Sequence, residues 1–185
     1  SGVVGTDVEV VQKTDYPWNG NVGITINPKA SKNFTLRLRV PDRDVSSLYA
    51  SKPAASGLTS LAVNGAAVKP VVANGYAAIT RTWKKGDTIT LELPMVAQRV
   101  YASEKIIDKI MTMVQGPDRT APPAPFYPLK DKVALRYGPL VYNLEQVDQD
   151  VTQALPPSSP LSTEWRKDLL GGVTVITGAF ANGAP

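Results

Sequence analysis

The fold class is indicated by one run in the first half of the chain, Phe34-Thr35-Leu36-Arg37-Leu38-Arg39-Val40. Its apolar side chains fall at every second position and alternate with threonine and arginine. A strand places successive side chains on opposite faces, so this run predicts a strand with one face in a core and the other in water. Such one-sided strands are typical of antiparallel sheets, whereas buried parallel strands are apolar throughout.

The same alternation recurs along the first half of the sequence. The runs lie at residues 8–13, 22–27, 61–63, 67–68, 76–83 and 88–93. Asn64-Gly65 and Asn74-Gly75 separate some of them, and Asn-Gly is favoured in tight type I′ hairpin turns because both positions need a positive φ. Short strands with turn signals between them predict an all-β fold, an antiparallel β-sandwich of jelly-roll-like kind, over residues 1–98.

The pattern changes in the second half. Residues 103–115 have apolar side chains at helical spacing, with Ser103 as the expected N-cap and Gly116-Pro117 as the stop, so they predict one short helix. Residues 117–128 contain five prolines and predict an extended loop. We therefore expect a helix and proline-rich connector over residues 99–131, followed by a smaller β region over residues 132–185 that is either an incomplete sandwich or a set of strands added to the first.

The composition excludes several classes of protein. The 185 residues include no histidine and no cysteine, so a Ser-His-Asp triad, a Cys-His pair, a disulfide and a Cys/His zinc site are all excluded. The net charge of +4 comes from scattered basic residues, which argues against nucleic-acid binding. No apolar stretch approaches the ~20 residues of a membrane helix. We expect no metal, no cofactor and no signal peptide. A periplasmic or secreted location is favoured over a cytoplasmic one, although the lack of cysteine fits both.

The carboxylates form no pair that resembles a catalytic site. Asp42 and Asp44 follow a strand, and Asp15 precedes Tyr16-Pro17, so turn formation explains all three. Asp148 and Asp150 lie in a loop near prolines, where a calcium site would need more oxygen ligands than the sequence supplies. We therefore predict no catalytic residue in this chain.

Aromatic side chains are the better candidates for contacts, because their faces stack on sugar rings and also fill domain interfaces. We expect Trp83 to lie in the core or in an interface. The residues predicted to contact a carbohydrate or another domain are Tyr16, Trp18, Tyr101, Arg136 and Tyr137.

A set of short strings, in order, resembles one known family. They are Thr14-Asp15-Tyr16-Pro17-Trp18-Asn19-Gly20, the run from Phe34 to Pro41, Val63-Asn64-Gly65, Gly75-Tyr76, Arg81-Thr82-Trp83, Lys85-Gly86-Asp87, Leu91-Glu92-Leu93-Pro94-Met95, the run from Val133 to Tyr142, and the run from Asp168 to Val173. Across about residues 6–178, the chain resembles the C-terminal region of the β-L-arabinofuranosidase-type glycoside hydrolases of family 127. The stretch from Ile106 to Tyr127 looks longer than the family pattern.

The resemblance implies a catalytic (α/α) barrel that precedes β-sandwich domains, and a cysteine nucleophile held near zinc by further cysteines and a glutamate. Because this chain has no cysteine, none of those residues can be assigned here. We therefore expect a non-catalytic C-terminal module that packs on the catalytic (α/α) barrel of a parent chain. The alternatives are an independent carbohydrate-binding module for arabinose-containing glycans, and an enzyme that uses a carboxylate pair of its own.

Overall fold

A computed structural model describes residues 5–43, 46–115, 132–145, 147, 150 and 152–181. The predicted helix stop at Gly116-Pro117, the proline-rich loop, Asp44 and Asp148 lie outside the described residues. The chain divides into two compact units. The first consists of residues 1–43 and 56–95, and the second of residues 44–55 and 96–185.

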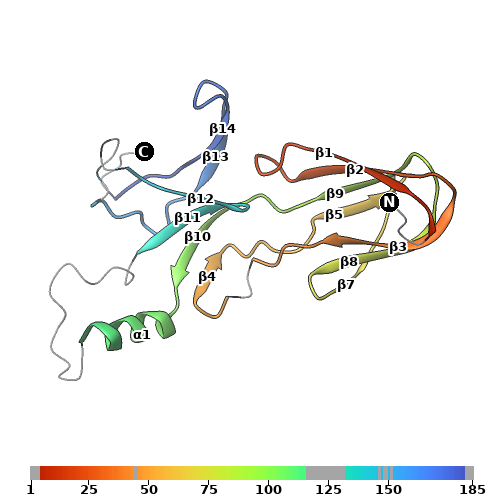
Figure 1. Cartoon of the computed structure of the whole chain (residues 1–185). Helices are drawn as coiled ribbons and strands as arrows, with labels where there is room; N and C mark the ends of the chain where they lie inside the picture. Colours follow the sequence, from red (N-terminus) through yellow and green to blue (C-terminus); the bar gives the residue numbers. More distant parts are fainter. Residues whose placement is uncertain are drawn as a thin grey trace. The chain divides into compact units, whose positions relative to one another are not determined.

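The first unit is a sandwich of two antiparallel sheets (Figure 1). The larger sheet has the order β1-β2-β9-β5-β6, with β1 (Val8–Thr14), β2 (Asn21–Pro28), β9 (Asp87–Glu92), β5 (Ser60–Val63) and β6 (Ala66–Ala67). The smaller sheet has the order β3-β8-β7, with β3 (Lys32–Arg39), β8 (Tyr76–Trp83) and β7 (Val71–Ala73). The all-β class and the antiparallel arrangement predicted from alternation are confirmed.

Both sheets contribute to one apolar core. Ile26 on β2, Ile89 on β9 and Trp83 on β8 are fully buried. Along β3 the side chain of Leu38 is buried, whereas Arg37 and Arg39 are exposed, as the alternation predicts. The Nε1 of Trp83 donates to the carbonyl of Phe34 at 3.1 Å, which satisfies the polar atom of this buried ring. The prediction that Trp83 lies in the core is confirmed.

Two hairpin turns form as their sequences predict. Asn64 and Gly65 have φ values of 51° and 80°, and Asn74 and Gly75 have φ values of 51° and 75°. Positive φ at both central positions is the requirement of the type I′ turn. The first turn joins β5 to β6, and the second joins β7 to β8.

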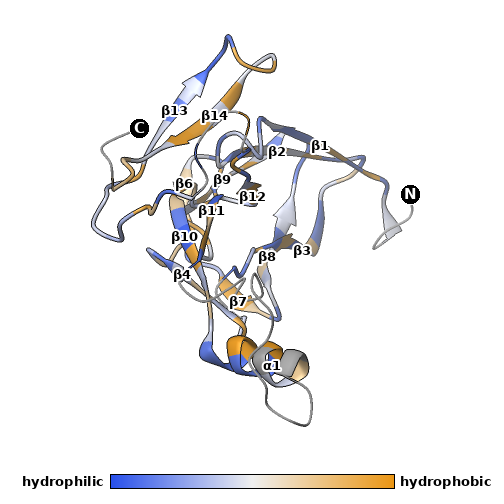
Figure 2. Ribbon diagram, turned by 90° about the vertical axis from the view of Figure 1, so that its left-hand side faces the viewer, coloured by the Kyte–Doolittle hydropathy of each residue, from blue (hydrophilic) through white to orange (hydrophobic). Residues whose placement is uncertain are grey.

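The second unit contains a four-stranded sheet, a hairpin and a helix. The sheet has the order β12-β11-β10-β4, with β12 (Leu140–Tyr142), β11 (Val133–Tyr137), β10 (Ala97–Ala102) and β4 (Tyr49–Lys52). The hairpin pairs β13 (Ser162–Arg166) with β14 (Val173–Thr177), and β14 is the more hydrophobic of the two strands (Figure 2).

The helix α1 (Glu104–Gln115) confirms the helix predicted over residues 103–115. The carbonyl of Ser103 accepts from the amides of Ile106 and Ile107 at 3.1 and 3.2 Å, so Ser103 is the residue at which the helix begins. Its hydroxyl donates to the Ser47 carbonyl at 3.1 Å instead of capping a helix amide. No helix within the described ranges has both the length and the apolar character needed to cross a membrane.

Strand β4 comes from a segment that interrupts the first unit in sequence. Residues 44–55 lie between β3 and β5, yet they belong to the second unit, where β4 pairs with β10. Strand β10 spans residues 97–102 and therefore crosses the predicted boundary at residue 98. The predicted division into 1–98, 99–131 and 132–185 stays a prediction from sequence.

Candidate functional site

The turn between β1 and β2 carries two of the predicted contact residues and is held by its own backbone. The carbonyl of Asp15 accepts from the amide of Trp18 at 2.8 Å. The hydroxyl of Thr14 donates to the carbonyl of Asn21 at 2.7 Å and accepts from the amide of Tyr16 at 3.0 Å. The expectation that Asp15 takes part in turn formation is met through its carbonyl oxygen.

Tyr16 is anchored inside the first unit. Its ring packs against the apolar core, and its hydroxyl accepts from Nη2 of Arg43 at 3.2 Å. The Nη1 of the same guanidinium donates to the carbonyl of Pro94 at 3.0 Å. Trp18, two positions further along the turn, remains 36% exposed. Of the two aromatic residues predicted here, Trp18 therefore presents the larger accessible face.

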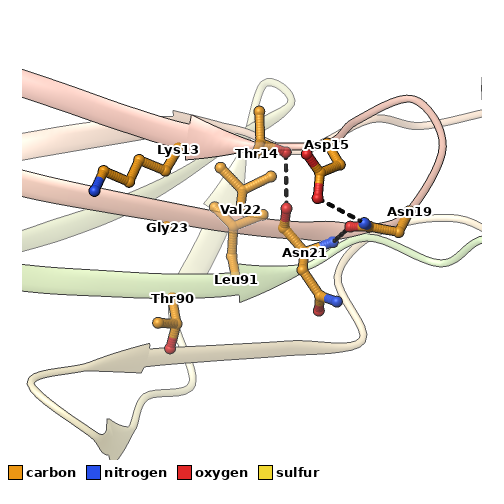
Figure 3. A pocket seen from close by; sticks show the side chains of 9 residues that line it. All are labelled: Lys13, Thr14, Asp15, Asn19, Asn21, Val22, Gly23, Thr90 and Leu91. Carbon is orange, nitrogen blue, oxygen red and sulfur yellow. Dashed lines mark hydrogen bonds between the residues drawn. The ribbon is translucent and has the colours of Figure 1, made fainter.

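A polar depression of about 430 Å³ lies beside this turn (Figure 3). It is lined by Lys13, Thr14, Asp15, Asn19, Asn21, Val22, Gly23, Thr90 and Leu91. The side-chain amide of Asn19 donates to Asp15 Oδ2 at 3.4 Å, and its oxygen accepts from the amide of Asn21 at 2.9 Å. The lining can bond hydroxyl groups, but it includes no aromatic face on which a sugar ring could stack.

The remaining predicted contact residues lie in the second unit. Arg136 on β11 donates through Nε and Nη2 to Gln98 Oε1 at 3.1 and 2.8 Å, and through Nη2 to Ser51 Oγ at 3.0 Å. Gln98 is fully buried, and its amide donates to the Pro53 carbonyl at 2.6 Å. Because Gln98 and Ser51 belong to β10 and β4, Arg136 ties neighbouring strands of this sheet together.

Tyr101 and Tyr137 lie on the face of the sheet opposite to Arg136. Register pairs Tyr101 with Val133 and Tyr137 with Ala97, and alternation along β11 puts Val133 and Tyr137 on one side. Both tyrosines are half-buried, and the ammonium of Lys52 lies 5.9 Å from the centre of the Tyr101 ring. Tyr101 and Tyr137 thus share a face of the sheet, while Tyr16 and Trp18 belong to the other unit.

The ionisable groups Asp87, Tyr142 and Asp150 have shifted pKa values, and each has a structural partner. The pKa of the Asp87 carboxyl is lowered, first by the amide of Lys84 and then by the side chain of Asn64. Burial raises the pKa of Tyr142, whose hydroxyl donates to the Thr174 carbonyl at 2.5 Å. The Asp150 carboxylate accepts from Thr152 and Gln153, which lowers its pKa. Within the described ranges no three acidic side chains gather where they could hold a metal ion.

Arg99 is a buried cation that the sequence analysis missed. It is 9% exposed, and its Nη2 donates to the carbonyls of Ser159 and Pro156 at 2.6 and 3.3 Å, while its Nε has no hydrogen-bond partner. These contacts fasten the loop that precedes β13 to strand β10. Residue type gave no signal of its burial, because arginine is usually exposed unless it is paired.

Comparison with known proteins assigns residues 3–95 to a family. The family model described as "Beta-L-arabinofuranosidase, GH127 middle domain" matches residues 3–95. This description does not confirm the C-terminal placement that the sequence resemblance implies. No protein with a curated description matches the chain. The carbohydrate-binding alternative gains no support from the matches.

Solved structures resemble nearly the whole chain. A GH127 β-L-arabinofuranosidase from Geobacillus stearothermophilus is 32% identical over 95% of this chain, with a TM-score of 0.70. A GH127 β-arabinofuranosidase is 26% identical over 97%, with a TM-score of 0.76. A structure described as a glycoside hydrolase is 25% identical over 96%, with a TM-score of 0.63.

The matched region is a small part of each of those proteins. The chain covers 24%, 26% and 27% of their respective lengths, which is about a quarter in each case. Residues 3–95 carry the family assignment, and the structural similarity extends it through the second unit. The chain therefore belongs to the GH127 β-L-arabinofuranosidase family, and residues 3–95, which hold nearly all of the first unit together with residues 44–55 of the second, correspond to the middle domain of that family.

Proposed function

We propose that this chain is a non-catalytic module of a glycoside hydrolase, and that it packs on and supports the catalytic barrel of its parent protein. The observation that carries the proposal is the match of residues 3–95 to a middle domain, together with relatives about four times as long as this chain. In such a protein, the catalytic groups belong to the three quarters of the sequence that lie outside this chain. The β-rich module provides a rigid surface against which the catalytic domain packs.

The chemistry of the chain supports a structural role. Without histidine or cysteine, its reactive groups are carboxylates, amines, hydroxyls and phenols. The carboxylates of Asp87 and Asp168 are bonded to neighbouring amide and guanidinium groups. Arg136 and Tyr16 are likewise held by internal hydrogen bonds. These bonds favour a scaffold over a site that must bind and release a substrate.

The contact residues of the module are part of the proposal. Trp18, Tyr101 and Tyr137 are partly exposed on their respective units. Of the predicted contact residues, these three are best suited to contact another domain. Tyr16 and Arg136 would act by holding the surrounding backbone in place. Arabinose-containing glycans are the proposed substrates of the parent enzyme, not ligands of this module.

The test compares the full-length gene product that carries this chain with a version from which residues 1–185 are deleted. We expect the catalytic part to unfold at a lower temperature after the deletion, because burial against the module is lost. The isolated chain should release no nitrophenol from an aryl β-L-arabinofuranoside. Turnover by the isolated chain, or unchanged thermal unfolding after the deletion, would overturn the proposal.

A further inference from the structure

The outward face of the β3-β8-β7 sheet has an unusual composition. Register and alternation place Arg37 and Arg39 on this face together with Tyr76 and Val71, while Phe34, Leu36 and Leu38 point to the core. Tyr76 is 43% exposed and Val71 is 77% exposed. The three strands contain no aspartate or glutamate, so no carboxylate on this sheet neutralises the two arginines.

One of the two arginines is fixed in place. Arg39 Nη1 donates to the carbonyl of Gly75 at 2.8 Å, and its guanidinium carbon lies 5.3 Å from the centre of the Tyr76 ring. A Cβ at Gly75 would lie 1.8 Å from Arg39 Nη1, so this approach needs the glycine. A guanidinium has five N–H donors, and most of those of Arg39 remain for a carboxylate. Arg37 stands about 7 Å further along the strand, because same-face residues are two positions apart.

The chemistry of the face favours a protein over a polysaccharide. Arg39 lies over the Tyr76 ring, so the aromatic surface on which a sugar would stack is already taken on that side. Centres of protein interfaces are enriched in arginine and tyrosine and depleted of lysine, aspartate and glutamate, which is the composition found here. On the same face, the hydroxyls of Thr35 and Thr80 bond to each other at 2.8 Å.

A second copy of this chain does not fit the same face. A two-fold contact sets a patch against itself, so Arg37 and Arg39 would face their own equivalents without an intervening acid. The partner must instead bring carboxylates to the guanidinium groups of two arginines whose Cα atoms are about 7 Å apart along one strand.

We propose that this face, defined by Arg37, Arg39, Tyr76 and Val71, is a further surface, separate from Trp18 and Tyr101, through which the module docks on an acidic patch of the catalytic barrel. The inference rests on the proposed function and adds to it the surface and the charge of the partner. Carboxylates of the barrel pair with Arg37 and with the free donors of Arg39, while Tyr76 and Val71 are covered by apolar side chains. Screening by salt weakens this contact, because both arginines are near solvent.

The experiment is hydroxyl-radical labelling of Tyr76, read by mass spectrometry, in the full-length gene product and in the isolated chain. Tyr49 is an internal reference, since its exposure of 44% in the second unit matches the 43% of Tyr76. We expect the two tyrosines to label alike in the isolated chain. In the full-length protein the labelling of Tyr76 should fall several-fold, and it should recover in R37E and at high salt. K85E makes a similar charge reversal in the β8–β9 turn and should leave the labelling low.

The docking surface and the supporting role of the module are contradicted by different results. If deletion of the module destabilises the catalytic part but Tyr76 labels equally in both proteins, the docking surface is wrong and the supporting role stands. Dimerisation of the isolated chain with protection of Tyr76 would also overturn the surface, as would protection of Tyr76 by polygalacturonate alone. If the deletion has no effect on the catalytic part, the supporting role fails, and the surface assignment fails with it.

Discussion

The side-chain amide of Asn64 donates to Oδ1 of Asp87 at 2.8 Å and so joins the β5–β6 turn to the start of β9. The other carboxylate oxygen accepts from the amide of Lys84 at 2.8 Å, and Asn64 Oδ1 accepts from the amide of Thr88 at 2.8 Å. Asp87 is 8% exposed, so its charge depends on these donors. A turn residue and a buried carboxylate thus stabilise each other across two hairpins.

The substitution D87N should lower the free energy of unfolding by about 1–3 kcal/mol at pH 7, because a buried acceptor of two hydrogen bonds is replaced by a group that can accept at one end only. The folded pKa of Asp87 lies below its ordinary value of 3.8. Its stabilising effect is therefore complete above about pH 4 and is lost as the pH falls through the lower folded value. Urea unfolding at several pH values should show the gap between wild type and D87N narrowing below pH 4.

The matched control for this prediction is D168N. Asp168 accepts from a cation, with Oδ2 at 2.7 Å from Arg166 Nη2, and its pKa is lowered to about 2 by that hydrogen bond. Because this pair is exposed, its removal should leave stability at pH 7 unchanged. Equal losses in D87N and D168N would contradict the role given to burial.

The close approach of Gly20 to Leu93 predicts a second result. A Cβ at Gly20 would lie 2.0 Å from the backbone oxygen of Leu93, and the amide of Leu93 donates to the Gly20 carbonyl at 2.9 Å. Because a backbone oxygen cannot move aside cheaply, G20A should cost about 1–3 kcal/mol. The comparison variant is G23A, whose new Cβ would meet its nearest atom, the Lys13 carbonyl oxygen, at 3.7 Å. In urea titrations G23A should stay within about 1 kcal/mol of wild type.

The buried Trp83 predicts a third result. In W83F the Phe34 carbonyl loses its indole donor and the core loses volume, so we expect a loss of about 1–3 kcal/mol. Trp165 is 51% exposed, and W165F should cost less than about 1 kcal/mol. Fluorescence supplies an independent check, since W83F should remove the most blue-shifted emission of the folded chain. Retention of that emission in W83F would place the buried indole elsewhere.

The hydrogen bonds of Gln98 predict a fourth result, in the second unit. Q98A removes the oxygen that accepts from two nitrogen atoms of Arg136 and the amide that donates to Pro53. Hydrogen bonds to charged groups contribute about 1.5–3 kcal/mol each, so a loss of at least that size is expected. S51A removes one contact of Arg136 at 3.0 Å and leaves those to Gln98, so its loss should be smaller. A larger effect of S51A in thermal unfolding would contradict this order.

The half-buried strands and the hairpin turns could be predicted from short stretches of sequence. The alternation of Phe34, Leu36 and Leu38 with Arg37 and Arg39 predicted a half-buried strand, because side-chain direction in a strand repeats every two residues. Asn64-Gly65 and Asn74-Gly75 predicted their turns, because few other pairs adopt positive φ at both positions. Both signals lie within a few residues of chain.

The candidate contact residues illustrate the opposite case. The sequence predicted a contact of Arg136 with a carbohydrate or another domain, and the fold brings its guanidinium to Gln98 and Ser51, which are 38 and 85 positions away. In the sequence, Arg37 and Arg39 indicated only a solvent-exposed face of a strand. The sheet register, which pairs them with Ala78 and Tyr76, and the lack of acidic residues on the three strands show that this face is basic and partly aromatic. Neither result follows from residue type or spacing.

The sequence by itself determined the all-β class, the turn positions, the helix after Ser103 and the absence of histidine and cysteine chemistry. The tertiary structure alone decided that residues 44–55 leave the first unit to supply β4, and that the larger sheet has the order β1-β2-β9-β5-β6. The physical reason is that backbone preference and alternation are properties of neighbouring residues. Strand partners are chosen by the burial of all apolar faces at once, and that choice depends on the whole chain.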